Sequence, residues 1–289
     1  MSWISAPRTY DHQIHQSGLA DDDALAALLD AYPAELLDFN AYSYDAEGQV
    51  SLETGERGRA SGADLLAAIK AGRVWVNLRD AHEAHPALWK HIKPAFEAMA
   101  RDMGVRPIKV TGQLILSSPQ TKVPYHFDAA GVVLFHLRGV KKLWVYPVDE
   151  AHIPQESAEK VIMRVQAEEL PYRMAFDQDA QVVELQPGQA LTWPLYAPHR
   201  VENQGVFNVS LSLDFQTWET RLLRGAHYTA GAMRRWGLTP PDLEKTPVPV
   251  RAAMWLASLV IKKANLVPNL IKDYQRSFDL SDNRARKAA

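Results

Sequence analysis

The sequence contains no cysteine among its 289 residues. This absence excludes disulfide bridges, cysteine-ligated zinc, iron–sulfur clusters and thiol nucleophiles, so any metal site must use histidine and carboxylate ligands. No hydrophobic run approaches the roughly 18 apolar residues of a membrane-spanning helix. The longest apolar stretch, 252–261, is followed at once by two lysines, and the first twenty residues are polar and lack a secretory signal pattern. These absences predict a soluble, cytoplasmic protein.

The chain also lacks a strong net charge, which is −2 at neutral pH. Near-neutrality argues against a protein that binds nucleic acid through phosphate contacts. The charge is unevenly distributed, because residues 218–289 contain 13 Lys and Arg but only 6 Asp and Glu. This asymmetry predicts a separate, basic C-terminal module.

Hydrophobic periodicity divides the chain into three regions. Residues 1–107 are predicted to be mainly helical, with Asp21–Asp23 and Ser61 as helix-capping positions and a short strand at 74–76. Residues 108–217 contain short β-rich runs separated by turn residues, at 109–117, 132–137, 141–146, 181–185, 190–193 and 207–215. Residues 218–289 return to helical patterns. The expected fold is therefore mainly β with flanking helices, and its core is a sandwich or jelly roll.

The β-rich region contains the tripeptide His126-Phe-Asp128. Side chains two residues apart on a strand point to the same face, so His126 and Asp128 are expected to converge. His199 follows at the start of a later strand. Two histidines and one carboxylate leave three positions of an octahedral ion open, as Fe(II) oxygenases require. The alternative interpretation is that these residues only make structural hydrogen bonds.

The run Lys141 to Tyr146 contains two adjacent lysines. If the run is a strand, one of Lys141 and Lys142 faces inward. A buried unpaired ammonium is costly, so an inward lysine would require an anion such as a dicarboxylate. Alternatively, both lysines extend to solvent at the end of the strand.

Four elements together resemble the JmjC and cupin-like Fe(II)/2-oxoglutarate dioxygenases, especially the type of asparaginyl hydroxylase that acts on hypoxia-inducible factor. They are His126-Phe-Asp128, Gly139-Val-Lys-Lys-Leu-Trp-Val-Tyr-Pro147, Pro187-Gly188 and Pro198-His-Arg-Val-Glu-Asn203. The resemblance covers about a third of the chain, 109–215. It implies a double-stranded β-helix with iron on His126, Asp128 and His199, and with Lys141 binding the distal carboxylate of 2-oxoglutarate.

This chain departs from the family pattern at several positions. Val123 stands where the family often has a hydroxyl residue that helps to bind the cosubstrate, and Tyr125 or a hydroxyl from the strand 113–117 is expected to replace it. His136 is the one polar residue on its face of the strand after the metal tripeptide, so we assign it to cosubstrate binding with Lys141 and Tyr125. Asp214 stands where the hydroxylase has an amide, which places a carboxylate near an anionic cosubstrate.

The sequence thus predicts an Fe(II)- and 2-oxoglutarate-dependent oxygenase, a hydroxylase of a protein side chain or a small molecule. One alternative is a cupin metalloenzyme that does not use 2-oxoglutarate. Another is a non-catalytic binding or regulatory protein whose basic C-terminal helices contact an acidic partner. The helix that carries Val250, Met254, Ala257 and Ile261 is apolar on nearly all sides, which predicts burial all round and homodimerisation through the C-terminal helices.

Overall fold

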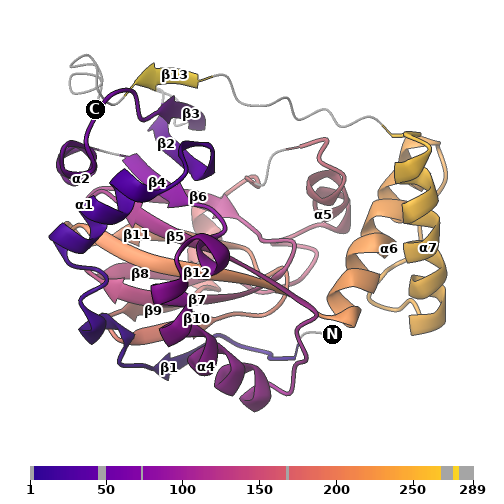
Figure 1. Ribbon diagram of the computed structural model, residues 1–289. Helices are drawn as coiled ribbons and strands as arrows, with labels where there is room; N and C mark the ends of the chain where they lie inside the picture. The colour runs from indigo at the N-terminus through magenta and orange to yellow at the C-terminus, as the bar shows by residue number, and fades with distance from the viewer. Residues whose placement is uncertain (1–2, 45–49, 73, 167–168, 268–275, 280–289) are drawn as a thin grey trace.

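Two β-sheets form the centre of the molecule (Figure 1). The computed structural model describes residues 3–44, 50–72, 74–166, 169–267 and 276–279. The strands of the larger sheet are β1 (Arg8–Asp11), β2 (Leu37–Tyr44), β3 (Val50–Glu56), β4 (Val74–Leu78), β5 (Lys109–Ser117), β7 (Gly131–Arg138), β10 (Gln189–Thr192), β12 (Asn208–Gln216) and β13 (Arg276–Asp279). Their order across the sheet is β1-β10-β7-β12-β5-β4-β2-β3-β13.

The smaller sheet contains four strands, β6 (Lys122–His126), β8 (Lys141–Val145), β9 (Gln181–Leu185) and β11 (His199–Asn203). Their order is β6-β11-β8-β9, and all neighbours in it are antiparallel. In the larger sheet, only the pair of β13 with β3 is parallel. The β-rich middle of the sequence is therefore confirmed as a mainly antiparallel structure.

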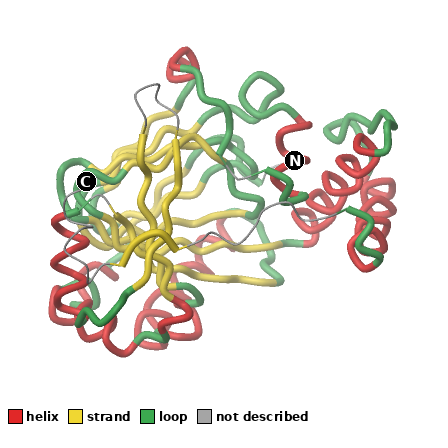
Figure 2. The backbone as a smooth tube through the Cα atoms, turned by 90° about the horizontal axis from the view of Figure 1, so that it is seen from above, coloured by secondary structure: helices red, strands yellow, loops and turns green. Residues whose placement is uncertain are grey.

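Seven α-helices surround the sheets: α1 (Asp22–Ala31), α2 (Gly62–Ala71), α3 (Ala81–Ala84), α4 (Pro86–Asp102), α5 (Gln155–Ile162), α6 (Trp218–Arg235) and α7 (Val248–Lys263). Three short 3₁₀-helices lie at Ile14–Ser17, Ala34–Leu36 and Met174–Gln178. These counts refer to the described residues. Helices α1, α2 and α4 pack on the outer face of the larger sheet and form the main core with it. Helices α6 and α7 lie together on another side (Figure 2).

Local sequence explains where several helices begin. The Ser61 hydroxyl accepts a hydrogen bond from the backbone N–H of Asp64, as its predicted capping position requires, and α2 ends at Ala71, just before the C-cap residue Gly72. Helix α6 begins with a reciprocal capping box between Thr217 and Thr220. Each such cap stabilises its helix by about 1 kcal/mol. At α1, Asp21 is the N-cap residue by position, although its side chain makes no capping hydrogen bond.

The two faces of the larger sheet have different chemistry. Along β12, Leu211 and Leu213 point outward into the main core. Ser210 and Ser212 point the other way, toward the smaller sheet: Ser210 is hydrogen-bonded to His136, and Ser212 lines a cavity. The outer face therefore supplies the apolar core, and the space between the sheets is partly polar.

The N-terminal region differs from the mainly helical prediction, because β1 to β4 extend the larger sheet. The short strand expected at 74–76 is confirmed as β4, but β2 was not predicted. In β2, Leu37 and Phe39 are buried and Asp38 points to Arg79 on the other side. This period-two alternation covers too few residues to stand out in a sequence otherwise rich in helical patterns.

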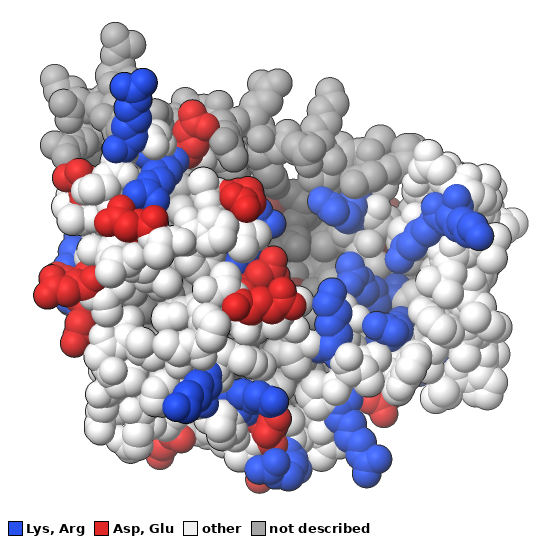
Figure 3. All heavy atoms as spheres, viewed as in Figure 1, with Lys and Arg blue, Asp and Glu red and all other residues white. Residues whose placement is uncertain are grey.

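The C-terminal region also differs from its prediction, since α7 is not buried all round. Met254 and Ile261 pack inside the protein, whereas Leu256, Leu259 and Val260 are 55%, 46% and 65% exposed. On the face seen in Figure 3, most Asp and Glu side chains lie over the sheets, and Lys and Arg side chains gather beside α6 and α7. No helix within the described ranges is long and apolar enough to cross a membrane.

Candidate metal centre

The end of β6 brings the two ends of the His126-Phe-Asp128 tripeptide to one side. His126 and Asp128 face the space between the sheets, where both line a cavity, and Phe127 is fully buried in a separate apolar cluster. Strand β11 lies beside β6, and its first residue, His199, pairs directly with His126 across the two strands. Residues far apart in the sequence thus meet at the same edge of the smaller sheet.

The side chains of His126, Asp128 and His199 lie close enough to bind one ion. One potential ligand atom from each residue lies within 4.8 Å of the other two. The Nε2 atom of His199 is 3.3 Å from Oδ2 of Asp128, and the two imidazole centroids are 4.2 Å apart. Adjacent ligand atoms of an octahedral ion with bonds near 2.1 Å lie about 3 Å apart. The spacing of this group therefore fits a divalent cation.

Backbone carbonyls orient both imidazole rings. Nδ1 of His126 is 2.7 Å from the carbonyl oxygen of Pro124, and Nδ1 of His199 is 3.1 Å from that of Ala197. A carbonyl can only accept a hydrogen bond, so each Nδ1 carries the proton and donates it. In a neutral ring bonded in this way, Nε2 has the free lone pair that a metal-binding histidine needs.

Burial keeps His199 neutral. The side chain is 4% exposed, and desolvation, helped by the neighbouring His126, lowers its pKa to about 4 although Asp128 acts in the opposite direction. The ring of Trp193 lies 4.5 Å from that of His199 and shields it further from water. At neutral pH this imidazole is therefore uncharged and available as a ligand.

A cavity of about 200 Å³ opens beside this group and lies between the two sheets. Lys141 lines it from β8, and Gly139, whose φ of +87° suits only glycine, makes the turn that leads into this strand. The other lining residues are Trp75, Asn77, Gln113, Ile115, Ser117, Thr121, Val123, Leu134, Leu143, Glu169, Trp193, Val201, Asn203 and Ser212. The cavity therefore joins the histidine–carboxylate group to one buried cation, a second carboxylate from Glu169 and several neutral polar side chains.

Lys141 is the inward member of the lysine pair. It is 5% exposed, and burial lowers its pKa to about 8. Within the described part of the chain, no carboxylate forms an ion pair with it. The neighbouring Lys142 points to the opposite face, where its ammonium lies 4.8 Å from the centre of the Trp144 ring. The structure thus leaves an unpaired ammonium inside a cavity, where an anion would stabilise it.

Several polar residues of the cavity were not predicted. Asn77 comes from β4, and its Oδ1 atom is buried without a hydrogen-bond partner in the described structure. Glu169 reaches the cavity through an isolated bridge with His126. Asn203 donates hydrogen bonds to the Ser117 hydroxyl and the Ser118 carbonyl. The register between distant strands brings these residues to the cavity, and short-range sequence patterns do not predict that register.

Two predicted cosubstrate residues, Tyr125 and His136, are not among the described residues that line the cavity. The Tyr125 hydroxyl donates to the carbonyl of His152, because alternation along β6 points Tyr125 away from His126. His136 is fully buried between Ser210 and the Gly139 carbonyl. Burial, together with the charge of Lys141, lowers the pKa of His136 to about 3, which keeps it neutral. Neither residue is placed to touch a ligand in the cavity.

Of the positions that depart from the family pattern, some line the cavity and others do not. Val123 does line the cavity, so its lack of a hydroxyl affects the pocket directly. The strand 113–117 contributes Ser117 and Gln113, as the prediction of a replacement from this strand allows. Asp214 is not among the described cavity residues; it lies opposite Thr111 and Val132 in the larger sheet.

No protein-family model matches the chain, and no curated protein matches it. A structure of E. coli YcfD is 16% identical, with 93% of this chain and 67% of that chain covered and a TM-score of 0.48. A structure of the E. coli ribosomal oxygenase YcfD is 15% identical, with coverage of 91% and 64% and a TM-score of 0.46. A complex of YcfD with cobalt and 2-oxoglutarate is 14% identical, with coverage of 90% and 64% and a TM-score of 0.45.

This chain thus spans 64–67% of the length of those structures. They are structures of YcfD, and they give no support to the finer resemblance to the asparaginyl hydroxylase that acts on hypoxia-inducible factor.

Proposed function

We propose that this chain is an Fe(II)- and 2-oxoglutarate-dependent oxygenase that hydroxylates a protein side chain or a small molecule. One observation carries the proposal: the same cavity contains two oriented imidazoles with a carboxylate and an unpaired buried lysine. A metal site alone fits many enzymes. The buried ammonium of Lys141 favours an anion as the ligand that binds beside the metal. The sequence resemblance implies that this anion is the dicarboxylate 2-oxoglutarate.

The proposed core is a double-stranded β-helix. From β5 to β12, the strands are divided between the two facing sheets, with β5, β7, β10 and β12 in one and β6, β8, β9 and β11 in the other. Such a division supports a jelly roll. It also places the ends of β6 and β11 together, where the proposed ligands lie.

His126, Asp128 and His199 would hold the metal through Nε2, a carboxylate oxygen and Nε2. The bonds from Nδ1 to the Pro124 and Ala197 carbonyls fix the ring planes before the metal arrives, which raises affinity. Bound there, Fe(II) together with 2-oxoglutarate and O₂ supplies the oxidising power for C–H hydroxylation, with succinate and CO₂ as the other products.

Lys141 would bind the distal carboxylate of 2-oxoglutarate. Its ammonium is already desolvated by the fold, so the ion pair forms in a region of low dielectric constant, where it is strong. Leu134, Leu143 and Val201 surround the cavity with apolar groups that exclude water. The protein thus supplies orientation, charge and a dry cavity.

The test is succinate formation from 2-oxoglutarate by the Fe(II)-loaded protein, compared between Lys141→Ala and Lys142→Ala. Turnover without a prime substrate suffices, so the substrate need not be known. Wild type and Lys142→Ala are expected to form succinate, and Lys141→Ala to lose at least about tenfold in activity at limiting 2-oxoglutarate. A metal-loaded wild type that forms no succinate, or equal rates for both variants, contradicts the proposal.

A further inference from the structure

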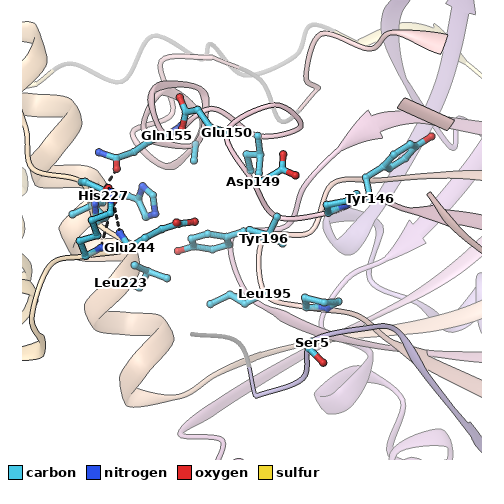
Figure 4. Close-up of a pocket in the computed structure, with 18 of the residues that line it drawn as sticks. Ser5, Tyr146, Asp149, Glu150, Gln155, Leu195, Tyr196, Leu223, His227 and Glu244 are labelled. Atoms are coloured by element: carbon cyan, nitrogen blue, oxygen red, sulfur yellow. Dashed lines mark hydrogen bonds and ion pairs between the residues drawn. The ribbon is translucent and has the colours of Figure 1, made fainter. Parts of the chain in front are cut away.

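Helix α6 presents two sides of different character. Leu223 and His227 line a cavity of about 1290 Å³ between this helix and the smaller sheet (Figure 4). Arg221, Arg224 and Tyr228 lie three, four or seven positions apart, so they share another side of the helix. This second side combines positive charge with an aromatic ring.

Lys262 from α7 lies close to this side of α6. Its ammonium is 4.2 Å from the centre of the Tyr228 ring, and burial, together with the charge of Arg224, lowers the pKa of Lys262. The guanidinium carbon of Arg221 is 5.3 Å from the centre of the Trp218 ring. Arg221, Arg224 and Lys262 are called the α6–α7 cation cluster below.

The cluster has no anionic partner within the described part of the chain. Arg234, further along α6, bonds to Glu159 at 2.8 Å, but no described carboxylate forms an ion pair with a member of the cluster. Arg221 and Arg224 are half-buried, and Nε of Arg224 is buried without a hydrogen-bond partner. Because these like charges repel one another and have lost part of their hydration, a bound anion would stabilise them.

The charge on the rest of the molecule limits the size of this anion. The whole chain has a net charge of −2 although residues 218–289 are basic, so the preceding region is acidic. Figure 3 shows Asp and Glu side chains over the sheets on the same face as the Lys and Arg side chains beside α6 and α7. A long nucleic acid strand or an anionic bilayer would extend over these carboxylates and be repelled, whereas a short acidic segment would not.

The surface next to the cluster suits a polypeptide. Trp218 is 57% exposed, and its ring packs edge to face on that of Trp255 at 6.3 Å, which restricts its orientation. Tryptophan and arginine are among the residues enriched in protein–protein interfaces. An acidic segment that also carries an apolar side chain would match both the charge of the cluster and the exposed indole.

We propose that the α6–α7 cation cluster binds an acidic segment of another polypeptide. Glu or Asp side chains of the segment pair with Arg221, Arg224 and Lys262, and an apolar side chain contacts Trp218. None of these four residues lines the cavity beside the metal centre, so the interaction goes beyond the proposed oxygenase activity.

Fluorescence anisotropy with the intact, metal-free chain tests the proposal. The probe is labelled Ala-Glu-Leu-Glu-Glu-Leu-Glu-Ala, and its control is Ala-Gln-Leu-Gln-Gln-Leu-Gln-Ala with the same label. The acidic peptide is expected to bind at low ionic strength at least about tenfold more tightly than the control, and to weaken as salt is added. A thymidine oligonucleotide or phosphatidylserine vesicles that bind as tightly as the peptide would assign the surface to another class of partner and overturn the proposal.

Two variants locate the binding. Arg224→Gln and Lys262→Gln are each expected to weaken the acidic peptide by about threefold, and the double variant by about tenfold. Lys90→Gln, at an exposed lysine of α4, is the matched control and should leave the affinity unchanged. Neither cluster variant should lower the melting temperature, because each removes one of several like charges. Absence of peptide binding by the wild type, or an affinity of the double variant within about twofold of wild type, contradicts the proposal. Because the metal-free chain is used, this result is independent of iron and 2-oxoglutarate.

Discussion

At the scale of single residues, alternation along strands decides which side chains can meet. His126 and Asp128 share a face because they lie two positions apart, and this part of the site was predictable from sequence. The same rule places Tyr125 on the opposite face, where its hydroxyl bonds to the His152 carbonyl, so this geometry does not support its predicted role at the cosubstrate. His136 is turned inward, but its two ring nitrogens are occupied by Ser210 and Gly139.

Only part of the environment of the adjacent lysines, Lys141 and Lys142, could be predicted from the sequence. The sequence indicates that one of the pair faces inward if the run is a strand, and the structure assigns this position to Lys141. Two other residues that line the cavity, Asn77 and Glu169, could not be predicted. They come from segments whose position beside the cavity depends on long-range register.

The altered pKa of Lys141 predicts a pH dependence of cosubstrate binding. Burial lowers the pKa from 10.5 to about 8, so the ammonium is charged below this pH and neutral above it. An anion binds the charged form, and affinity for 2-oxoglutarate should therefore be constant near pH 7 and fall by about tenfold per unit above pH 8. Isothermal titration across this range measures the effect.

The control for this dependence is Lys141→Arg, whose guanidinium stays charged throughout. In this variant the decline above pH 8 should disappear, even if its affinity is lower than that of wild type. A decline of equal steepness in Lys141→Arg would show that another group causes it.

At the scale of elements, strands bounded by turn residues were predictable, and β5 and β9 match their predicted limits. The start of helix α2 was predictable from the capping residue Ser61. The extension of the sheet by β1 to β4 was not, since short strands gain their stability from neighbours that the sequence does not identify. Helix α7 was predicted to be buried all round because its composition is apolar, but within the described part of the chain it packs mainly against α6 and leaves another face exposed.

Homodimerisation through the C-terminal helices remains a proposal. We expect the interface to be the exposed face of α7, which carries Leu256, Leu259 and Val260. Of the predicted stripe Val250, Met254, Ala257 and Ile261, Met254 and Ile261 pack within the chain, whereas Val250 is 46% exposed. Val260→Asp should convert a dimer to a monomer with little loss of folding stability, because Val260 is 65% exposed. Light scattering measures the mass. Val182→Asp on β9 is the matched control, since Val182 is 48% exposed and lies in the smaller sheet rather than on α7. A monomeric wild type, or a dimer that survives Val260→Asp, contradicts this proposal.

At the scale of the whole molecule, the division of strands between two sheets creates the candidate metal centre. The space between the sheets holds His126, Asp128, His199 and Lys141, and their meeting is not local in sequence. The sequence predicted that His126, Asp128 and His199 would come together because residue type, spacing and order together form a recognisable pattern.

The central claim is that three residues hold one divalent metal ion, and an anaerobic Fe(II) titration of the metal-free protein tests it most directly. The wild type and His91→Ala, a variant at an exposed histidine of α4, should bind one equivalent of iron. His199→Ala should bind it at least about a hundredfold more weakly, because one of three ligands is lost. Absence of stoichiometric iron in the wild type, or unchanged affinity in His199→Ala, would contradict the account.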